Sequence, residues 1–404
     1  MSSKWLSLEE ALSKALEAAC PINETEMVTL FEANGRILAQ DAIATLDVPP
    51  WDNSAMDGYA VNSSALADNS TVAVQGVITA GMEATTPLTT NSAFKIMTGA
   101  PVPPNADAVV MIENTSAEGG SVTIEQLPKS GENIRRRAND IAVDDVLIKQ
   151  GTLLKAEHLM LLSSQGKNAV EVYRKLKVGV VATGSELAAP GTERLATQIF
   201  ESNRVGISSI LHGEHVDIID FGIVEDNEAS LRTLFTQAVS QVDVMISSGG
   251  VSVGDADYVK DIISELGNID FWKIAVKPGK PFALGSINGT LFCGLPGNPV
   301  SSFVTAKLLV VPIIQKMQGQ KAQPAPLYIN AKITRDLKRR AGRRDFQRAT
   351  MSQDAKGEWH VTPFKKQSSG VMTSITAANC LMVIHESISS LNEGDVVPVM
   401  PLYS

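Results

Sequence analysis

The segment from Lys177 to Leu309 alternates short apolar runs with loops that are rich in glycine, proline and acidic residues. Each run is β-branched or aromatic enough to be a buried strand, and amphipathic stretches separate the runs. This alternation predicts right-handed crossovers and a parallel or largely parallel sheet with helices on both faces. The predicted strands are 178–182, 216–219, 242–246, 271–276 and 289–293, and the predicted helices are 204–211, 227–239, 256–266 and 299–317.

The loops that follow these strands contain the most unusual residues of the segment. In an open α/β sheet such loops lie at the carboxyl edge, where ligands bind. We therefore expect their side chains to converge in space. The loops are 183–186, 225–227, 247–250, 277–280 and 295–298.

The chain has 404 residues, and single cores stop growing near ~250 residues, so several domains are expected. Short alternating runs between turns predict a β-rich lobe and a C-terminal small all-β barrel, with a sandwich as the alternative. The barrel strands are expected at 328–333, 345–351, 358–363, 380–385 and 395–400. The predicted domains are a discontinuous α/β N-terminal domain (1–46 and 141–175), the inserted β-rich lobe (47–140), the central doubly wound α/β domain (176–320) and the barrel (326–404).

Composition limits the class of protein. The formal net charge is −9, so nonspecific binding to nucleic acid or to an anionic membrane is disfavoured. The N-terminus lacks an apolar signal segment, and no apolar run approaches the ~20 residues that span a bilayer. We expect a soluble cytoplasmic protein. The cysteines Cys20, Cys293 and Cys380 lack the spacing of a zinc site or a disulfide framework.

Several residues of the central segment suit an anionic ligand. Lys277 and Lys280 flank a Pro-Gly turn, an arrangement that fits a phosphate or another tetrahedral oxyanion, although two solvated lysines on a turn are the alternative. Asn298 precedes Pro299 at a helix start, where backbone amides attract anions. The segment 247–252 adds hydroxyls and two glycines that let a ligand approach the backbone.

Carboxylates occur in the same loops. Beside anion-binding lysines they make electrostatic sense if a divalent cation lies between them, and hard oxygen ligands suit Mg²⁺. Helix capping is an equal alternative for Asp226 and Asp255, whereas function is favoured for Glu186 and Asp257. No GxxxxGK[ST] or GxGxxG motif is present, which disfavours standard nucleotide-triphosphate and dinucleotide enzymes.

Six motifs, in order along essentially the whole chain, resemble those of the MoeA family, the molybdopterin molybdenumtransferases, which includes the C-terminal domain of gephyrin. The motifs are DNSAMDGYA (52–60), MTGAPVP (97–103), NIRRR (133–137), SSGGVSVGD (247–255), KPGKP (277–281) and GLPGNPVS (294–301).

The resemblance implies a homodimer of four-domain subunits whose central domain is similar to molybdopterin adenylyltransferases. The implied reaction takes adenylylated molybdopterin and molybdate, hydrolyses the adenylyl linkage with Mg²⁺ and leaves molybdenum on the pterin dithiolene. Molybdopterin adenylyltransferase and molybdoenzyme apoproteins are implied partners. A gephyrin-like scaffold and a tungsten-inserting paralogue are the alternatives, and the second shares every residue named here.

The resemblance also assigns roles to individual residues. Glu186, Asp226 and Asp257 would handle Mg²⁺ and the adenylyl phosphate, and Lys273 and Lys277 would contact the nucleotide–pterin ligand. Ser185 departs from the family, which often has an acidic residue there, and this weakens a two-carboxylate clamp on that loop. The molybdate pocket would contain Lys277, Lys280, Pro281, Arg344, Ser368 and Ser369; other substrate positions would be Ser248, Gly249, Gly250, Pro296, Asn298 and Pro299; and Asp57, Thr98 and Asp140 would complete a cleft that the dimer partner closes.

Overall fold

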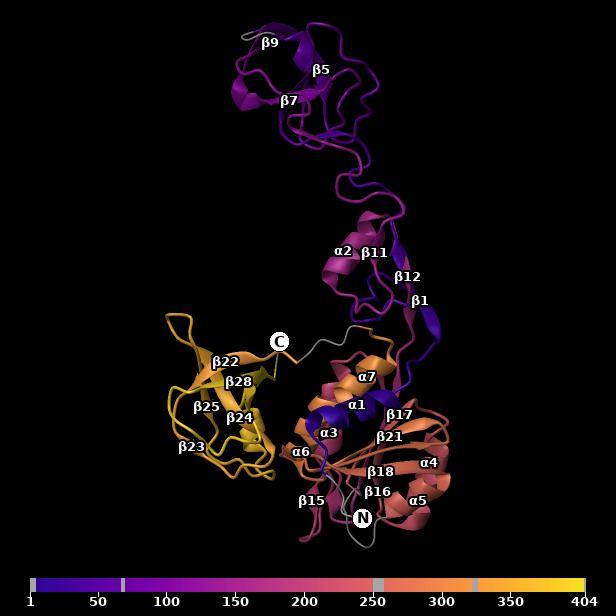
Figure 1. Cartoon of the computed structure of the whole chain (residues 1–404). Coiled ribbons are helices and arrows are strands. Elements are labelled where there is room, and N and C mark those ends of the chain that lie inside the picture. The colour runs from indigo at the N-terminus through magenta and orange to yellow at the C-terminus, as the bar shows by residue number, and fades with distance from the viewer. Residues whose placement is uncertain (1–4, 67–69, 250–257, 322–325, 403–404) are drawn as a thin grey trace. The chain divides into compact units, whose positions relative to one another are not determined.

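The computed structural model describes residues 5–66, 70–249, 258–321 and 326–402 (Figure 1). The chain forms two compact units, each with its own core. The first comprises Met1–Gln40, Gln150–Ala156 and Ala169–Ser404, and the second comprises Asp41–Lys149 and Glu157–Asn168. This division is coarser than the four expected domains, whose boundaries stay a prediction.

A six-stranded sheet forms the centre of the first unit, with strand order β16-β13-β17-β21-β20-β18. The first four strands of that order are parallel, as the alternation of apolar runs predicted. They are β16 (Asp217–Val224), β13 (Lys177–Thr183), β17 (Val244–Ser248) and β21 (Thr290–Leu295). The helices that accompany them are α3 (Asn203–His212), α4 (Glu228–Ala238) and α5 (Tyr258–Leu266).

Two further strands, β20 (Pro281–Ile287) and β18 (Gly267–Lys273), extend the sheet in antiparallel fashion. Strand β20 was not predicted from the sequence, because it starts with proline and contains a glycine. The signal was the next pair, Asn288-Gly289, which has positive φ at both residues (48° and 91°) and forms a two-residue hairpin turn. Since two antiparallel steps restore the direction of β21, β18 also ends at the carboxyl edge.

The helical run 299–317 packs inside this domain as α6 (Pro299–Thr305), a π-helical turn η3 (Ala306–Val310) and α7 (Val311–Met317). Its length and hydropathy alone would suit a membrane span, but most of it is buried within the largest core cluster. Helix α1 (Leu8–Ala18) packs against α7 and starts with the capping box of Ser7 and Glu10. The run is therefore a core helix of the α/β domain.

A closed β-barrel follows in the same unit, as expected for the C-terminal segment. Strand β24 (Arg344–Gln353) pairs with both β25 (Trp359–Pro363) and β26 (Cys380–Ile384), which closes the ring. The other barrel strands are β22 (Ile329–Ile333) and β28 (Val396–Pro401). The remaining elements of the first unit are β1 (Thr25–Thr29), β12 (Ala169–Tyr173), β14 (Leu187–Ala188), β15 (Ile199–Phe200), β19 (Val276–Lys277), β23 (Leu337–Lys338), β27 (Ser390–Leu391) and α8 (Thr373–Thr376).

The short strand β19 connects the α/β domain to the barrel. It lies in the link between β18 and β20 and pairs in parallel with β24. In that register Val276 is opposite Arg344, and Lys277 is opposite Asp345. The lysine-bearing link at the carboxyl edge of the central sheet is thus hydrogen-bonded to the first residues of a barrel strand.

The second unit is β-rich, as predicted for the lobe. Its six-stranded sheet has the order β7-β4-β6-β5-β9-β8. The strands are β4 (Gly58–Val61), β5 (Thr71–Ile78), β6 (Ser92–Ile96), β7 (Ala108–Met111), β8 (Thr115–Glu118) and β9 (Ser121–Ile124). Shorter elements are β2 (Ala42–Ile43), β3 (Asn53–Ser54), β10 (Ile134–Arg135), β11 (Val146–Ile148), η1 (Ser63–Ala65), η2 (Ile112–Asn114) and α2 (Ala156–Ser164), whose first residue belongs to the first unit.

One ion pair secures the amino edge of the central sheet. Arg174 donates to both carboxylate oxygens of Asp243, at 2.7 and 2.8 Å, and the amide of Lys177 donates to the same carboxylate at 2.8 Å. Burial alone would raise the pKa of Asp243, but these donors outweigh it and the pKa is lowered. The pair joins the end of β12 to the starts of β13 and β17.

We expect Asp243→Asn to lower the free energy of unfolding by about 1.5–3 kcal/mol at pH 7, because charged hydrogen bonds are lost. A carboxylate whose pKa is lower in the folded than in the unfolded protein stabilises the fold at pH values above its unfolded pKa, near ~3.9. This stabilisation is lost as the pH falls through the pKa of the folded state. Urea denaturation should therefore show the difference from wild type shrinking below pH ~4. Asp217→Asn, which removes an exposed partner of Lys175 at 3.8 Å, is the control and should have little effect; equal losses in both variants would contradict the assignment.

Candidate functional site

A cavity of about 670 Å³ opens where the carboxyl-edge loops of the central sheet meet the barrel. All of its lining residues belong to the first unit. They are Thr183, Gly184, Glu186, Asp226, Gly249, Lys277, Pro278, Gly279, Lys280, Pro281, Pro296, Gly297, Asn298, Ser301, Arg343, Gln367, Ser368 and Ser369. The predicted convergence of the loops is therefore present, and the barrel supplies the remaining wall.

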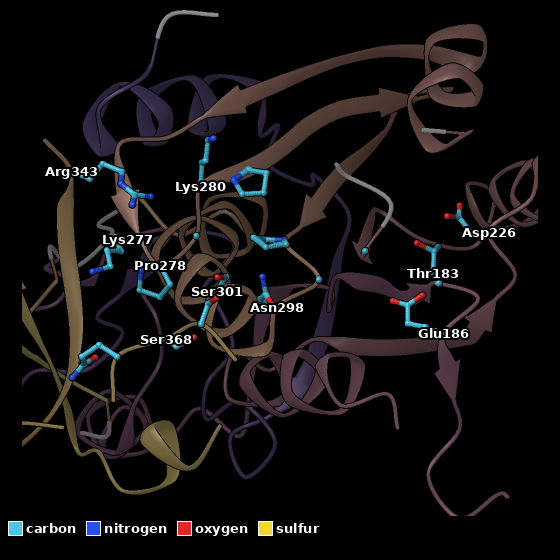
Figure 2. Close-up of a pocket in the computed structure, with 18 residues that line it drawn as sticks. Thr183, Glu186, Asp226, Lys277, Pro278, Lys280, Asn298, Ser301, Arg343 and Ser368 are labelled. Atoms are coloured by element: carbon cyan, nitrogen blue, oxygen red, sulfur yellow. The ribbon is translucent and has the colours of Figure 1, made fainter. Parts of the chain in front are cut away.

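Charge is segregated along this cavity. Figure 2 shows Lys277, Lys280 and Arg343 gathered at one end, whereas Glu186 and Asp226 lie together at the other. Neutral polar side chains, among them Asn298 and Ser301, lie between the two ends. A ligand that spans the cavity meets cations at one end and carboxylates at the other.

The acidic end is formed by the loops that follow β13 and β16. Much of the Asp226 side chain is exposed, but partial desolvation and then the neighbouring Glu186 carboxylate raise the pKa of Asp226. Gly249, at the end of β17, approaches the same loop: its φ is +96°, and a Cβ there would lie 2.4 Å from the Thr183 carbonyl oxygen. Only glycine fits this position, so the backbone is close-packed below the acidic end.

The cationic end is formed mainly by the link between β18 and β20. Gly279 has φ of +109°, and a Cβ there would lie 2.5 Å from Thr305 Oγ1, so the Pro-Gly turn rests directly on helix α6. Lys277 and Lys280, on either side of the turn, both line the cavity. The Lys280 ammonium also lies 5.1 Å from the centroid of the Trp5 ring, a cation–π contact. A rigid turn thus presents both ammonium groups.

The arginine of the cavity is Arg343, whereas the family resemblance assigned Arg344. Successive side chains of an extended chain point in opposite directions, and β24 begins here. Arg343 lines the cavity, while Arg344 pairs with Glu9 and, at 3.3 Å, with Glu386. The structure therefore places the guanidinium of the neighbouring residue at the cationic end.

The barrel loop that carries Ser368 and Ser369 is held by a buried arginine that was not among the predicted site residues. Arg348 is 1% exposed and donates to Ser368 O at 3.2 Å and to Ser374 Oγ at 2.9 Å. Gln367 brackets the backbone of Arg348, accepting from its amide at 3.1 Å and donating to its carbonyl at 2.8 Å. The amide of Val300 on α6 donates to Ser369 O at 3.3 Å, which ties this loop to the central domain.

A second cavity, of about 610 Å³, adjoins the first. The two share Lys277, Lys280 and Arg343, so these side chains form a wall between them. The other lining residues of the second cavity are Trp5, Ala275, Arg339, Arg340, Ala341 and Gly342. The positive charge at this end therefore extends beyond the first cavity.

Other predicted residues support the cavity from outside its lining. Ser248 is buried at the end of β17, and its hydroxyl accepts from Asn203 Nδ2 at 2.8 Å. Asn203 also donates to the carbonyl of Gly297 at 2.7 Å, so this unpredicted residue joins two of the carboxyl-edge loops. Lys273 ends β18 and is half-buried, and Pro299 opens α6 beside a separate small apolar cavity.

Five predicted residues remain. Asp257 and Gly250 fall outside the described residues. Asp57, Thr98 and Asp140 belong to the second unit. There the Asp57 carboxylate accepts from the amide and hydroxyl of Thr98 at 2.7 and 2.8 Å, and these hydrogen bonds lower the pKa of Asp57.

Comparison with known proteins assigns the family. Models of the MoeA N-terminal region (domain I and II), the probable molybdopterin binding domain and the MoeA C-terminal region (domain IV) match residues 6–166, 179–316 and 330–402. The chain is 43% identical over 98% of both chains to a molybdopterin molybdenumtransferase of Haemophilus influenzae, and 34% identical to one of Nostoc sp., covering 94% of this chain and 89% of that one.

Solved structures agree with this assignment. The chain is similar to the molybdopterin biosynthesis MoeA protein from Pyrococcus horikosii, with a TM-score of 0.82 and 32% identity over 99% of this chain and 100% of that one. The full-length similarity agrees with the motifs and with the closed barrel of the structure. The chain therefore belongs to the MoeA family of molybdopterin molybdenumtransferases.

Proposed function

We propose that this protein inserts molybdenum from molybdate into adenylylated molybdopterin, with hydrolysis of the adenylyl linkage and release of AMP. The observation that carries the proposal is the segregation of charge within one cavity (Figure 2). The cationic end can bind a small oxyanion directly. The acidic end can hold a metal ion, which in turn can bind a nucleotide phosphate.

The cationic end suits molybdate. Molybdate is a tetrahedral dianion, and ionic hydrogen bonds from ammonium and guanidinium groups are the strong ones available to it. Lys277, Lys280 and Arg343 supply these donors, and the hydroxyls of Ser368 and Ser369 lie on the barrel side of the same cavity. Arg348 and Gln367 hold that barrel loop in place, so the donors are preorganised.

The acidic end suits a hard divalent cation. Glu186 and Asp226 are close enough for the Glu186 charge to raise the pKa of Asp226, and a cation between them would relieve this repulsion. Mg²⁺ prefers such oxygen ligands together with substrate phosphate oxygens. When bound, it would neutralise charge on the adenylyl phosphate, and Glu186 and Asp226 would hold it there.

The direct test is a single-turnover incubation of the purified protein with adenylylated molybdopterin, Mg²⁺ and molybdate. We expect AMP release that depends on molybdate and a product that reconstitutes a cofactor-free molybdenum enzyme. Tight binding of the pterin without AMP release would reject the transferase and favour a scaffold. Reconstitution only with tungstate would reject molybdenum as the metal.

Arg343→Gln and Arg344→Gln form a matched pair that tests the cationic end. Loss of a charged hydrogen bond costs about 1.5–3 kcal/mol, so Arg343→Gln should weaken molybdate binding about tenfold or more in a calorimetric titration. Arg344→Gln should leave the affinity near that of wild type, since its guanidinium pairs with Glu9 and Glu386. The reverse ranking would mean that the arginine of the site has been misassigned.

The raised pKa of Asp226 predicts a pH-dependent affinity for Mg²⁺. Only the carboxylate form binds the metal, so the dissociation constant for Mg²⁺ should increase as the pH falls toward that pKa, beginning at a higher pH than for an ordinary aspartate. Titration calorimetry without the pterin measures this. Asp226→Asn should bind Mg²⁺ more weakly and with a flatter pH profile; an unchanged profile would show that Asp226 does not bind the metal.

A further inference from the structure

Asp345, the second residue of β24, is a carboxylate buried behind the cationic end and only 1% exposed. Its Oδ2 atom lies 3.5 Å from Lys277 Nζ and 3.4 Å from Arg339 Nε. The same oxygen accepts a hydrogen bond from Gln347 Nε2 at 3.0 Å. A carboxylate so far from solvent is unfavourable unless cations compensate it, and its cations come from both the central domain and the barrel.

The two cations lie at different places in the two adjoining cavities. Lys277 lines the first cavity, and the β19–β24 register places its backbone opposite Asp345, whereas Arg339 lines only the second cavity. Arg339 donates to the carbonyls of His385 and Ile388 at 2.9 and 2.7 Å, and also to the carbonyl of Arg343. Asp345 therefore contacts one cation of the site directly and reaches the backbone of a second through Arg339.

The position of the Lys277 ammonium allows Asp345 and an anion in the cavity to compete for it. The Lys277 side chain is 43% exposed, whereas Asp345 is inaccessible, so a ligand meets the ammonium but not the carboxylate. A separation of 3.5 Å is longer than a normal charged hydrogen bond. The ammonium is thus attracted to Asp345 without being locked to it, and it can move toward an anion in the cavity.

We propose that Asp345 is an internal counter-ion that competes with the bound oxyanion for Lys277 and thereby limits the affinity of the cationic end. The proposal rests on the oxyanion site of the proposed function. For turnover, the consequence is that molybdate is not held too tightly by the cations. Binding energy that is equal in the ground state and the transition state lowers KM without accelerating transfer.

The test is Asp345→Asn, which removes the charge and keeps the shape. Titration with molybdate and with sulfate should show dissociation constants about three- to tenfold lower for both anions, because a negative charge near the site has been lost. In single-turnover assays KM for molybdate should fall and the rate constant should not rise. An unchanged or increased dissociation constant would overturn the proposal.

Control variants separate this effect from a structural one. Asp243→Asn removes a carboxylate from an ion pair at the opposite edge of the same sheet, and it should leave anion affinity unchanged. In a Lys277→Gln background, Asp345→Asn should change the affinity much less than in wild type, because the two residues act as a pair. Additive effects would place the action of Asp345 elsewhere.

A second variant covers the case in which Asp345→Asn does not fold. Gln347→Met removes the neutral side chain that donates a hydrogen bond to the Asp345 carboxylate. Because the carboxylate then attracts Lys277 more strongly, the dissociation constant for molybdate should rise. A fall or no change would contradict the proposal. If the wild-type protein binds neither anion, the oxyanion site itself fails; binding in wild type with no response in these variants rejects only the role of Asp345.

Discussion

The parallel pairing of β19 with β24 is the constraint on which the site depends. Only two residue pairs form it, yet it joins the link that carries Lys277 and Lys280 to the barrel strand that begins next to Arg343. The pairing helps to fix the distance between the lysines of the central domain and the arginine of the barrel segment, together with the core that Phe346 and Leu381 share with the central domain. The contact of Val300 with the Ser369 carbonyl secures the opposite wall in the same way.

The central sheet positions the other half of the site. Because β18 runs in the direction of β21, the antiparallel extension does not remove its loop from the carboxyl edge. Glu186, Asp226 and Gly249 follow three parallel strands. Lys277 and Lys280 lie instead between the antiparallel strands β18 and β20, and Arg343 directly precedes the barrel strand β24. The segregation of charge in the cavity is thus a consequence of sheet topology, and the glycines at 249 and 279 allow the close backbone contacts that it needs.

The sequence predicted the parts of this arrangement that depend on local pattern. Apolar periodicity located the four parallel strands, the helices and the barrel strands, and the edge rule for α/β sheets predicted that residues such as Glu186 and Lys277 converge. Features that depend on tertiary register were missed. The choice between Arg343 and Arg344 requires the phase of β24, and the supporting roles of Arg348 and Asn203 depend on loops that meet only in the folded chain. Strand β20 was missed because the Asn288-Gly289 hairpin signal was not weighed.

A tetrahedral metal oxyanion should bind at the cationic end, between the central domain and the barrel. The most direct measurement is anomalous X-ray diffraction from crystals soaked with molybdate, recorded on both sides of the molybdenum absorption edge. We expect an anomalous peak within hydrogen-bonding distance of Lys277, Lys280 and Arg343. A peak beside Glu186 and Asp226, or outside the cavity altogether, would contradict this expectation.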